Sequence, residues 1–143
     1  SFKSDQLEAV MDKRKLLIEV GGEKAIVKLL WTEAPQICQT LWDSLPLEST
    51  AHHAKLCNHE YMAQLRLEAP AENFKEVRIG DLGWWERMQT LNLWYDDRGP
   101  NGPLGPTCRF GVVESNLEGL AKVARQVWET SGQRIRLSKA REA

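Results

Sequence analysis

Residues 31–61 read WTEAPQICQTLWDSLPLESTAHHAKLCNHEY, and the rest of the chain is interpreted around this stretch. Its first half carries apolar residues at helical spacing, such as Ile37 and Leu41. Pro46 prevents the helix from continuing, because the residue before a proline disfavours the α region. We therefore expect a short helix, capped by Thr32, that lies on or across the mouth of a sheet. All three histidines of the chain follow this helix, and they lie within one stretch of eight residues, 52–59.

The residues that precede this stretch predict an antiparallel hairpin. Leu16, Ile18 and Val20 alternate with residues of the opposite face, which is the period-two pattern of a half-buried strand. Gly21 and Gly22 come next, and glycine supplies the positive φ that a two-residue turn requires. The chain then returns as a second strand.

The residues that follow it predict further strands and one more helix. We expect strands at 48–56, 59–67, 87–95, 108–115 and 133–137, and a short strand near Val77 and Ile79. Residues 80–85, GDLGWW, are expected to form a turn, and the Gly- and Pro-rich residues 96–107 an ordered surface loop. Ser115 and Glu118 have the spacing of a capping box, which would open a helix that ends at Gly132.

The composition is that of a single ordinary globular domain, with 143 residues of which 27% are charged. A net charge of −1 gives no electrostatic footprint for nucleic acid or an anionic membrane, and no apolar run approaches the length of a membrane span. Three cysteines without CxxC spacing fit reduced thiols in a cytoplasm. Residues 1–13 are expected to be a polar leader, weakly helical or frayed and without a signal peptide, 14–138 the folded domain and 139–143 a solvated tail.

Many evenly spaced strands favour a mainly β fold in which an antiparallel barrel closes on itself, because closure removes exposed edges. Several short motifs occur in a fixed order: Ala34-Pro35, Leu45-Pro46-Leu47, His53-Ala54, Glu60, Gly80-Asp81 and Arg109-Phe110-Gly111. In these motifs the chain resembles, over residues 14–138, a bacterial family of cyclophilin-like proteins of unknown function. The resemblance implies a closed cyclophilin-like barrel of about eight strands with two α-helices closing its ends. Residues 55–58 read KLCN, where the family pattern has Arg-Trp-Ser-Gly.

The stretch with the histidines supplies the candidate catalytic residues His53, Cys57 and Glu60. His53 and Glu60 are expected to lie close together across a turn, where a histidine–carboxylate pair can perform acid–base chemistry. Cys57 would add a nucleophile if a neighbouring cation stabilised its thiolate. His53, Cys57 and His59 also share strand parity, and a thiolate with two imidazoles is a set that Zn²⁺ or iron accepts. Metal sites usually draw ligands from two segments, so we favour scattered strand histidines with a buried thiol, and we expect no metal and no other cofactor.

The aromatic residues supply the candidate ligand-binding site, made of Trp84, Trp85 and Tyr95 with Arg109. Aromatic walls with a few polar groups are typical of small-molecule pockets, and an arginine can clamp a carboxylate with two hydrogen bonds. Trp84 and Trp85 are successive, so in an extended chain they cannot both point inward. At least one of them is therefore expected at a surface, in a pocket or against a partner; the alternative is that the tryptophans fill the core.

Three hypotheses about function follow. The first is a cytoplasmic protein that binds, or as an enzyme hydrolyses or isomerises, a small polar molecule such as a cyclic amide or a carboxylate. It rests on fold resemblance, since related barrels occur in enzymes of oxoproline hydrolysis. The second is a peptidyl-prolyl cis–trans isomerase, although the Phe-His-Arg run of true cyclophilins is absent. The third is a non-catalytic subunit of a homodimer or larger homo-oligomer, with the paired tryptophans at the contact.

Overall fold

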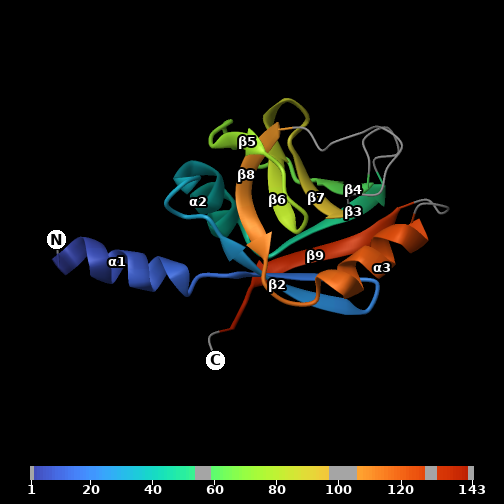
Figure 1. Cartoon of the computed structure of the whole chain (residues 1–143), viewed down its shortest axis with the longest axis horizontal. Helices are drawn as coiled ribbons and strands as arrows, with labels where there is room; N and C mark the ends of the chain where they lie inside the picture. Colours follow the sequence, from blue (N-terminus) through green and yellow to red (C-terminus); the bar gives the residue numbers. More distant parts are fainter. Residues whose placement is uncertain (1, 54–58, 97–105, 128–131, 142–143) are drawn as a thin grey trace.

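The chain forms a closed antiparallel β-barrel, as expected. The computed structural model describes residues 2–53, 59–96, 106–127 and 132–141. Eight strands follow one another around the barrel in the order β2-β1-β9-β3-β4-β7-β6-β8, and β8 pairs back with β2 (Figure 1). The eight strands are β1 (Leu16–Val20), β2 (Glu23–Leu29), β3 (Leu47–His53), β4 (His59–Gln64), β6 (Asp81–Trp85), β7 (Thr90–Asp96), β8 (Pro106–Val113) and β9 (Gln133–Lys139). The short strand β5 (Phe74–Glu76) adds to the first half of β8, outside the ring.

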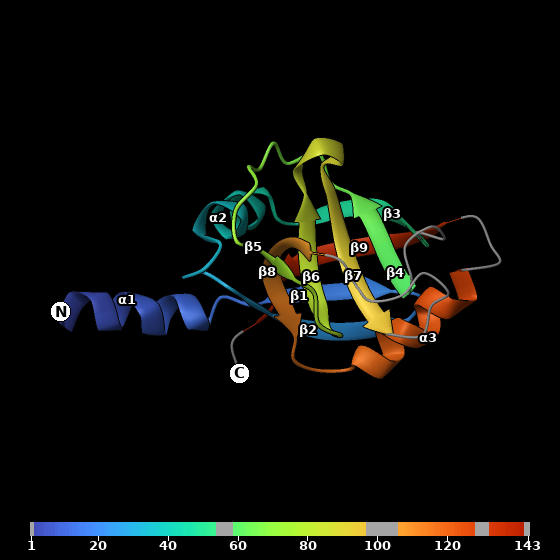
Figure 2. The same cartoon turned by 45° about the horizontal axis from the view of Figure 1, so that its top comes forward.

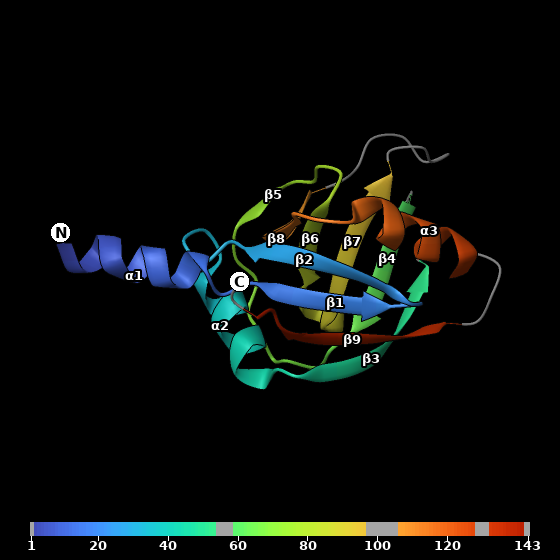
Figure 3. The same ribbon diagram turned by 90° about the horizontal axis from the view of Figure 1, so that it is seen from below.

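Two helices lie at opposite ends of the barrel, α2 (Pro35–Ser44) and α3 (Leu117–Val127) (Figures 2 and 3). Both pack their apolar side into the core, α2 through Ile37, Cys38 and Leu41. A third helix, α1 (Phe2–Asp12), belongs to the expected leader and extends away from the barrel. The two helices expected at the ends of the barrel are α2 and α3, and α1 forms in the leader, which was expected to be weakly helical or frayed. In the described part of the chain, no helix has both the length and the apolar character needed to cross a bilayer.

The first hairpin forms as the sequence predicts. Leu16, Ile18 and Val20 are buried, and β1 pairs with β2 through the register Val20 to Glu23. Gly21 and Gly22 form the turn with φ of +57° and +82°, values that residues with a Cβ rarely adopt.

Residues 80–85 are not the expected turn. Asp81–Trp85 form strand β6, which pairs with β7 on one side and β8 on the other. The chain changes direction at Gly80, one residue before β6 begins, and the φ of Gly80 is +94°. The short strand also lies earlier than predicted, at Phe74–Glu76 in place of 77–79.

Both helices begin in ways that the sequence did not indicate. The N-cap residue of α2 is Ala34, not Thr32, and Glu72 supplies the missing acceptor: the Ile37 N–H donates to Glu72 Oε1 over 2.6 Å. At α3, Asn116 Oδ1 accepts the Gly119 N–H over 3.1 Å, so Ser115 is not the cap. Asparagine and serine are equally good N-cap residues, so the sequence spacing could not distinguish Asn116 from Ser115, and the prediction of Ser115 was wrong.

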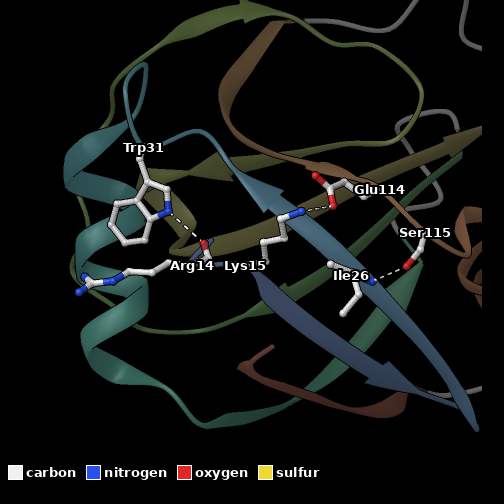
Figure 4. A network of polar contacts seen from close by, with 6 residues as sticks. All are labelled: Arg14, Lys15, Ile26, Trp31, Glu114 and Ser115. Carbon is white, nitrogen blue, oxygen red and sulfur yellow. Dashed lines mark hydrogen bonds and ion pairs between the residues drawn. The ribbon is translucent and has the colours of Figure 1, made fainter. Parts of the chain in front are cut away.

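Ser115 instead helps to close the barrel beside the β2–β8 seam. Its hydroxyl accepts the Ile26 N–H over 3.0 Å, and nearby the Lys15 ammonium lies 2.7 Å from Glu114 Oε2 (Figure 4). The Trp31 indole N–H donates to the Arg14 carbonyl oxygen over 3.1 Å and holds the entry to β1 against the start of α2. Three contacts between distant segments thus fix the region where the barrel closes.

Candidate functional site

Strand β7 has both of its faces buried, and the two faces differ in chemistry. Leu91, Leu93 and Tyr95 face the barrel interior, so Tyr95 lies in the core and not in the ligand site where it was predicted. Thr90, Asn92 and Trp94 project from the opposite, outer face of the strand and are also buried. On the neighbouring strand β4, Glu60 stands opposite Trp94 in the register and therefore shares this outer face.

Polar side chains form a row along the outer face. The Thr90 hydroxyl donates to Asn92 Oδ1 over 3.4 Å, and the Asn92 amide donates to Glu60 Oε1. Glu60 is only 5% exposed and Asn92 only 2%. A carboxylate and an amide at this depth are held in fixed orientations by their hydrogen bonds, so they offer directional contacts to a ligand.

A cavity of about 550 Å³ opens over this row and has mostly aromatic walls. Its size lies within the roughly 300–1,000 Å³ range of small-molecule sites. Glu60 and Asn92 are its buried polar lining, and its aromatic lining is Phe74, Trp84, Trp85 and Trp94. Of the predicted ligand-binding and catalytic residues, the cavity brings together Glu60, Trp84 and Trp85.

The paired tryptophans separate as strand parity predicts. Trp84 is 1% exposed, and its indole N–H donates to the Ala69 carbonyl oxygen over 3.1 Å. Trp85 is 49% exposed and stands at the edge of the cavity. Trp84 stands opposite Leu91 in the β6–β7 register, so its indole is buried on the interior face of the sheet, while that of Trp85 is on the outer face and accessible from solvent.

Close packing around Gly83 sets the shape of the cavity. Gly83 stands opposite Asn92 in the register, and a Cβ at this position would lie 2.4 Å from Thr107 Oγ1 and 2.8 Å from Trp94 Cζ3. Thr107 and Trp94 therefore rest directly on the backbone of β6, which only a glycine permits.

Arg109 lies on the same outer face, opposite Gly83 in the β6–β8 register, but its guanidinium is held by Asp81. Arg109 Nη2 donates to Asp81 Oδ1 over 3.0 Å, and Nε lies 2.6 Å from Oδ2. Asp81 is 1% exposed. A carboxylate ligand would have to compete with a buried aspartate for this arginine.

His53 faces the barrel interior, on the opposite side of the sheet from Glu60. It stands opposite Tyr61 in the β3–β4 register, and its Nε2 lies 2.5 Å from the Tyr95 hydroxyl. The Arg125 guanidinium stacks over the Tyr95 ring at 5.7 Å from its centroid. His53 and Tyr95 therefore form a second group near α3, and the structure does not bring His53 to the Glu60 carboxylate as the sequence led us to expect.

Cys57 lies outside the described residues, and so do residues 54–56, 58 and most of the predicted loop 96–107. The hypothesis of a metal at His53, Cys57 and His59 therefore falls largely outside them. Among the residues that the structure describes, no three His, Cys, Asp or Glu side chains gather in a way that could hold a metal ion.

Sequence reasoning missed Asn92, Phe74 and Thr107 as parts of this cavity. The signal for Asn92 was present, because Thr90, Asn92 and Trp94 alternate with the core residues of the same strand. The same alternation is typical of a half-buried strand whose polar face meets solvent, whereas here this face is buried as well. Cys108 also lines the cavity, and burial raises the pKa of its thiol, so it presents a neutral group there.

Comparison with solved structures shows the same fold elsewhere. The chain superposes on McbB, from a structure of McbB in complex with tryptophan, with a TM-score of 0.74 and 24% sequence identity; the match covers 90% of this chain and 45% of McbB. It also superposes on the hypothetical protein AF2241 from Archaeoglobus fulgidus, with a TM-score of 0.70, 21% identity and coverage of 90% and 96%. This chain thus spans less than half the length of McbB. At these identities the likeness establishes the fold.

Sequence comparison identifies the family. No protein with a curated description matches the chain. A family model matches residues 16–139, which include every strand of the barrel. The chain therefore belongs to the family described as "Protein of unknown function (DUF3830)".

Proposed function

We propose that this protein binds a small molecule with a flat, largely apolar body and a hydrogen-bond donor, in the cavity over β4, β6 and β7. The observation that carries the proposal is the buried Glu60–Asn92 pair beside the outer-face indoles of Trp85 and Trp94. Aromatic walls bury the body of a ligand, and a few fixed polar groups set its orientation. A carboxylate has lone pairs for several donors, so Glu60 can accept a ligand N–H in addition to the Asn92 amide.

Between the two ligand classes expected from the sequence, this arrangement favours the cyclic amide over the carboxylate. A cyclic amide has an N–H group that matches Glu60. A carboxylate would need Arg109, which Asp81 already holds through two contacts. If the protein hydrolyses the ring of a cyclic amide, Glu60 is our candidate for the general base. His53 and Tyr95 lie on the other face of the sheet, so we assign them no direct contact with a ligand in this cavity.

The solved structure of McbB in complex with tryptophan suggests the first probes. Tryptophan carries a flat ring with an N–H donor, which is the kind of ligand body that the cavity suits. Indole, tryptophan and 5-oxoproline together sample the aromatic and the cyclic-amide classes.

The proposal is tested by a substitution in strand β6, beneath the cavity, that reduces the volume of the cavity. Gly83→Ala would force Trp94 and Thr107 into the cavity and should weaken the binding of any ligand at least about tenfold, since even small misfits at a packed site cost 1–3 kcal/mol. Binding is followed by nuclear magnetic resonance, from the shifts of the indole N–H signals of Trp84, Trp85 and Trp94. Gly22→Ala is the control for lost stability without a change in the cavity: nothing lies within 4 Å of a Cβ at this hairpin position, but its φ of +82° strains any residue with a side chain.

Equal binding by the Gly83→Ala and Gly22→Ala proteins would contradict the proposed site. So would shifts confined to Trp31 and Trp42, which lie near α1 and α2 and do not line the cavity.

A second candidate function, a contact between subunits, has its own observation. Phe74, Trp85 and Met88 are exposed apolar side chains close to the mouth of the cavity. Exposed aromatic residues next to a groove are typical of interaction surfaces. Light scattering on the wild type and on Trp85→Ala separates the two functions: a variant that becomes monomeric yet binds ligand unchanged would favour the contact over the ligand site.

The structure gives less support to a prolyl isomerase. True cyclophilins use an arginine on the barrel face, and here the matching candidate, Arg109, is paired with Asp81. An isomerisation assay with a model proline peptide checks this alternative, and catalysis that is lost in Arg109→Ala would restore it.

A further inference from the structure

The lining of the cavity includes a hydroxyl group for which the protein supplies no partner. Thr107 on β8 lines the cavity and is only 7% exposed. Within the part of the chain that the structure describes, its hydroxyl hydrogen-bonds to no other group. Buried polar groups are nearly always paired, so a hydroxyl at this depth indicates a partner from outside the chain, either water or a ligand.

The position of Thr107 places this hydroxyl beside the other buried polar groups of the cavity. Its Oγ1 and Cγ2 would lie 2.4 and 2.5 Å from a Cβ on Gly83, so the side chain leans over β6. Gly83 stands opposite Asn92 on β7. Asn92, Gly83 and Thr107 therefore form a row across the outer face of three neighbouring strands, and the middle position of the row carries no side chain.

The edge of the Trp94 ring reaches the same place. A Cβ on Gly83 would lie 2.8 Å from Trp94 Cζ3, so the edge of this indole lies next to the Thr107 side chain. A flat ligand that packs against the indole therefore has its own edge within reach of the hydroxyl. The aromatic wall and the directional polar group can thus act on one ligand.

Two other donors of this face are already engaged. The Asn92 amide donates to Glu60 Oε1, and the Arg109 guanidinium donates to Asp81 Oδ1. A hydroxyl can both donate and accept a hydrogen bond, so Thr107 can supply the donor that a ligand acceptor requires. This role of a neutral group does not depend on the charge of Glu60.

We infer that Thr107 is a specificity-determining residue, whose hydroxyl donates a hydrogen bond to a carbonyl oxygen on the flat body of the ligand. The inference rests on the proposed function and narrows it, since a cyclic amide has a carbonyl oxygen next to its N–H group. A ligand without a carbonyl group would displace water from the hydroxyl and leave it unpaired, which disfavours that ligand. The cavity should therefore select lactams over aromatic rings that carry only an N–H group.

Oxindole and indole test the inference, because both have a flat bicyclic body with an N–H group and only oxindole has a carbonyl oxygen. Each is titrated into the wild-type protein by isothermal calorimetry. Oxindole should bind about three- to tenfold more tightly, as expected for one neutral hydrogen bond. Thr107→Val removes the hydroxyl at nearly constant shape and should bring the two affinities to within about twofold of each other, whereas Thr107→Ser retains a hydroxyl and should keep the preference.

Thr50→Val is the matched control, because it makes the same change at an exposed position of β3 outside the cavity lining, and it should leave the preference unchanged. If Thr107→Val does not fold, Thr107→Ala replaces it, with the same expected loss of preference. Equal binding of oxindole and indole by the wild type, or a preference that survives the loss of the hydroxyl, would overturn the role of Thr107 and leave the proposed binding function intact. Failure of both compounds to bind would instead count against the proposed function itself.

Discussion

Cys38 shows at the scale of a single residue how the barrel is sealed. The thiol lies at the end where α2 closes the core, is completely buried, and donates to the Phe110 carbonyl oxygen over 3.5 Å. Burial raises its pKa from 9.0 to about 12. The neutral thiol is therefore a packing group and not a nucleophile.

The shifted pKa of Cys38 predicts a loss of stability at high pH. As pH rises above about 9, the unfolded chain loses the thiol proton while the folded chain keeps it until about pH 12, and this difference favours unfolding. The free energy of unfolding should fall by up to about 1.4 kcal/mol per pH unit in this window. Urea denaturation at pH 8, 9, 10 and 11 measures the slope.

Cys38→Ala should lose this part of the slope while remaining slightly less stable at pH 8, because a small cavity is left behind. Tyr61, whose pKa burial also raises, contributes with the same sign at higher pH and is unchanged in both proteins. Identical slopes for the two proteins would show that the thiol ionises equally in the folded and unfolded states.

The candidate site was predictable only in part at this scale. Trp84, Trp85 and Glu60 could be chosen because residue type and strand parity are visible in the sequence. Which face of β4 carries Glu60, and which face of β3 carries His53, depends on the register between the two strands. Register is set by contacts between distant residues, so the pairing of His53 with Glu60 could not be judged from their spacing.

At the scale of an element, α2 depends on a residue far from it in the chain. Its N-cap residue Ala34 makes no side-chain hydrogen bond, and Glu72 accepts the Ile37 N–H in its place. The same carboxylate lies near the positive end of the helix dipole. The segment that leads into β5 is thereby tied to the helix that closes the barrel.

Glu72→Ala should lower the free energy of unfolding by about 1 kcal/mol, the usual cost of removing an N-terminal cap. Glu72→Gln should cost less, because its carbonyl oxygen still accepts the hydrogen bond but carries no charge. Glu76→Ala, which removes an exposed glutamate four residues further along the chain, should have almost no effect. Chemical denaturation of the three variants measures these differences, and an effect of Glu76→Ala as large as that of Glu72→Ala would argue against capping.

Elements whose ends are set by nearby glycine or proline residues were predicted well, whereas elements that depend on pairing with distant strands were not. The first hairpin and the end of α2 depend on glycines and a proline within a few residues, so the sequence shows them. Residues 81–85 form a strand because β7 and β8 supply partners on both sides. Two glycines and an aspartate in six residues otherwise favour a turn, and pairing with distant strands overrides that local preference.

At the scale of the whole molecule, closure depends on the pairing of β2 with β8, more than 80 residues apart along the chain. No local pattern indicates this pairing, and the expectation of closure came from the number of strands and from family resemblance. Helix α1 contributes little to the closed structure. It extends away from the barrel (Figures 1 and 3). Among its described side chains, Leu7 and Val10 are exposed and only Met11 packs partly against the core.

Removal of residues 1–12 should therefore leave the barrel folded and cooperative. The Arg14 carbonyl oxygen that accepts the Trp31 N–H is retained, and the loss of Met11 packing should cost no more than about 2 kcal/mol. The dependence of the unfolding free energy on urea should change little, because the core surface exposed on unfolding is nearly the same. Met11→Ala in the full chain is the control that isolates the packing of this one side chain. If the shortened protein loses its cooperative transition while Met11→Ala keeps it, then α1 is an integral part of the folding unit and not an appendage to the barrel.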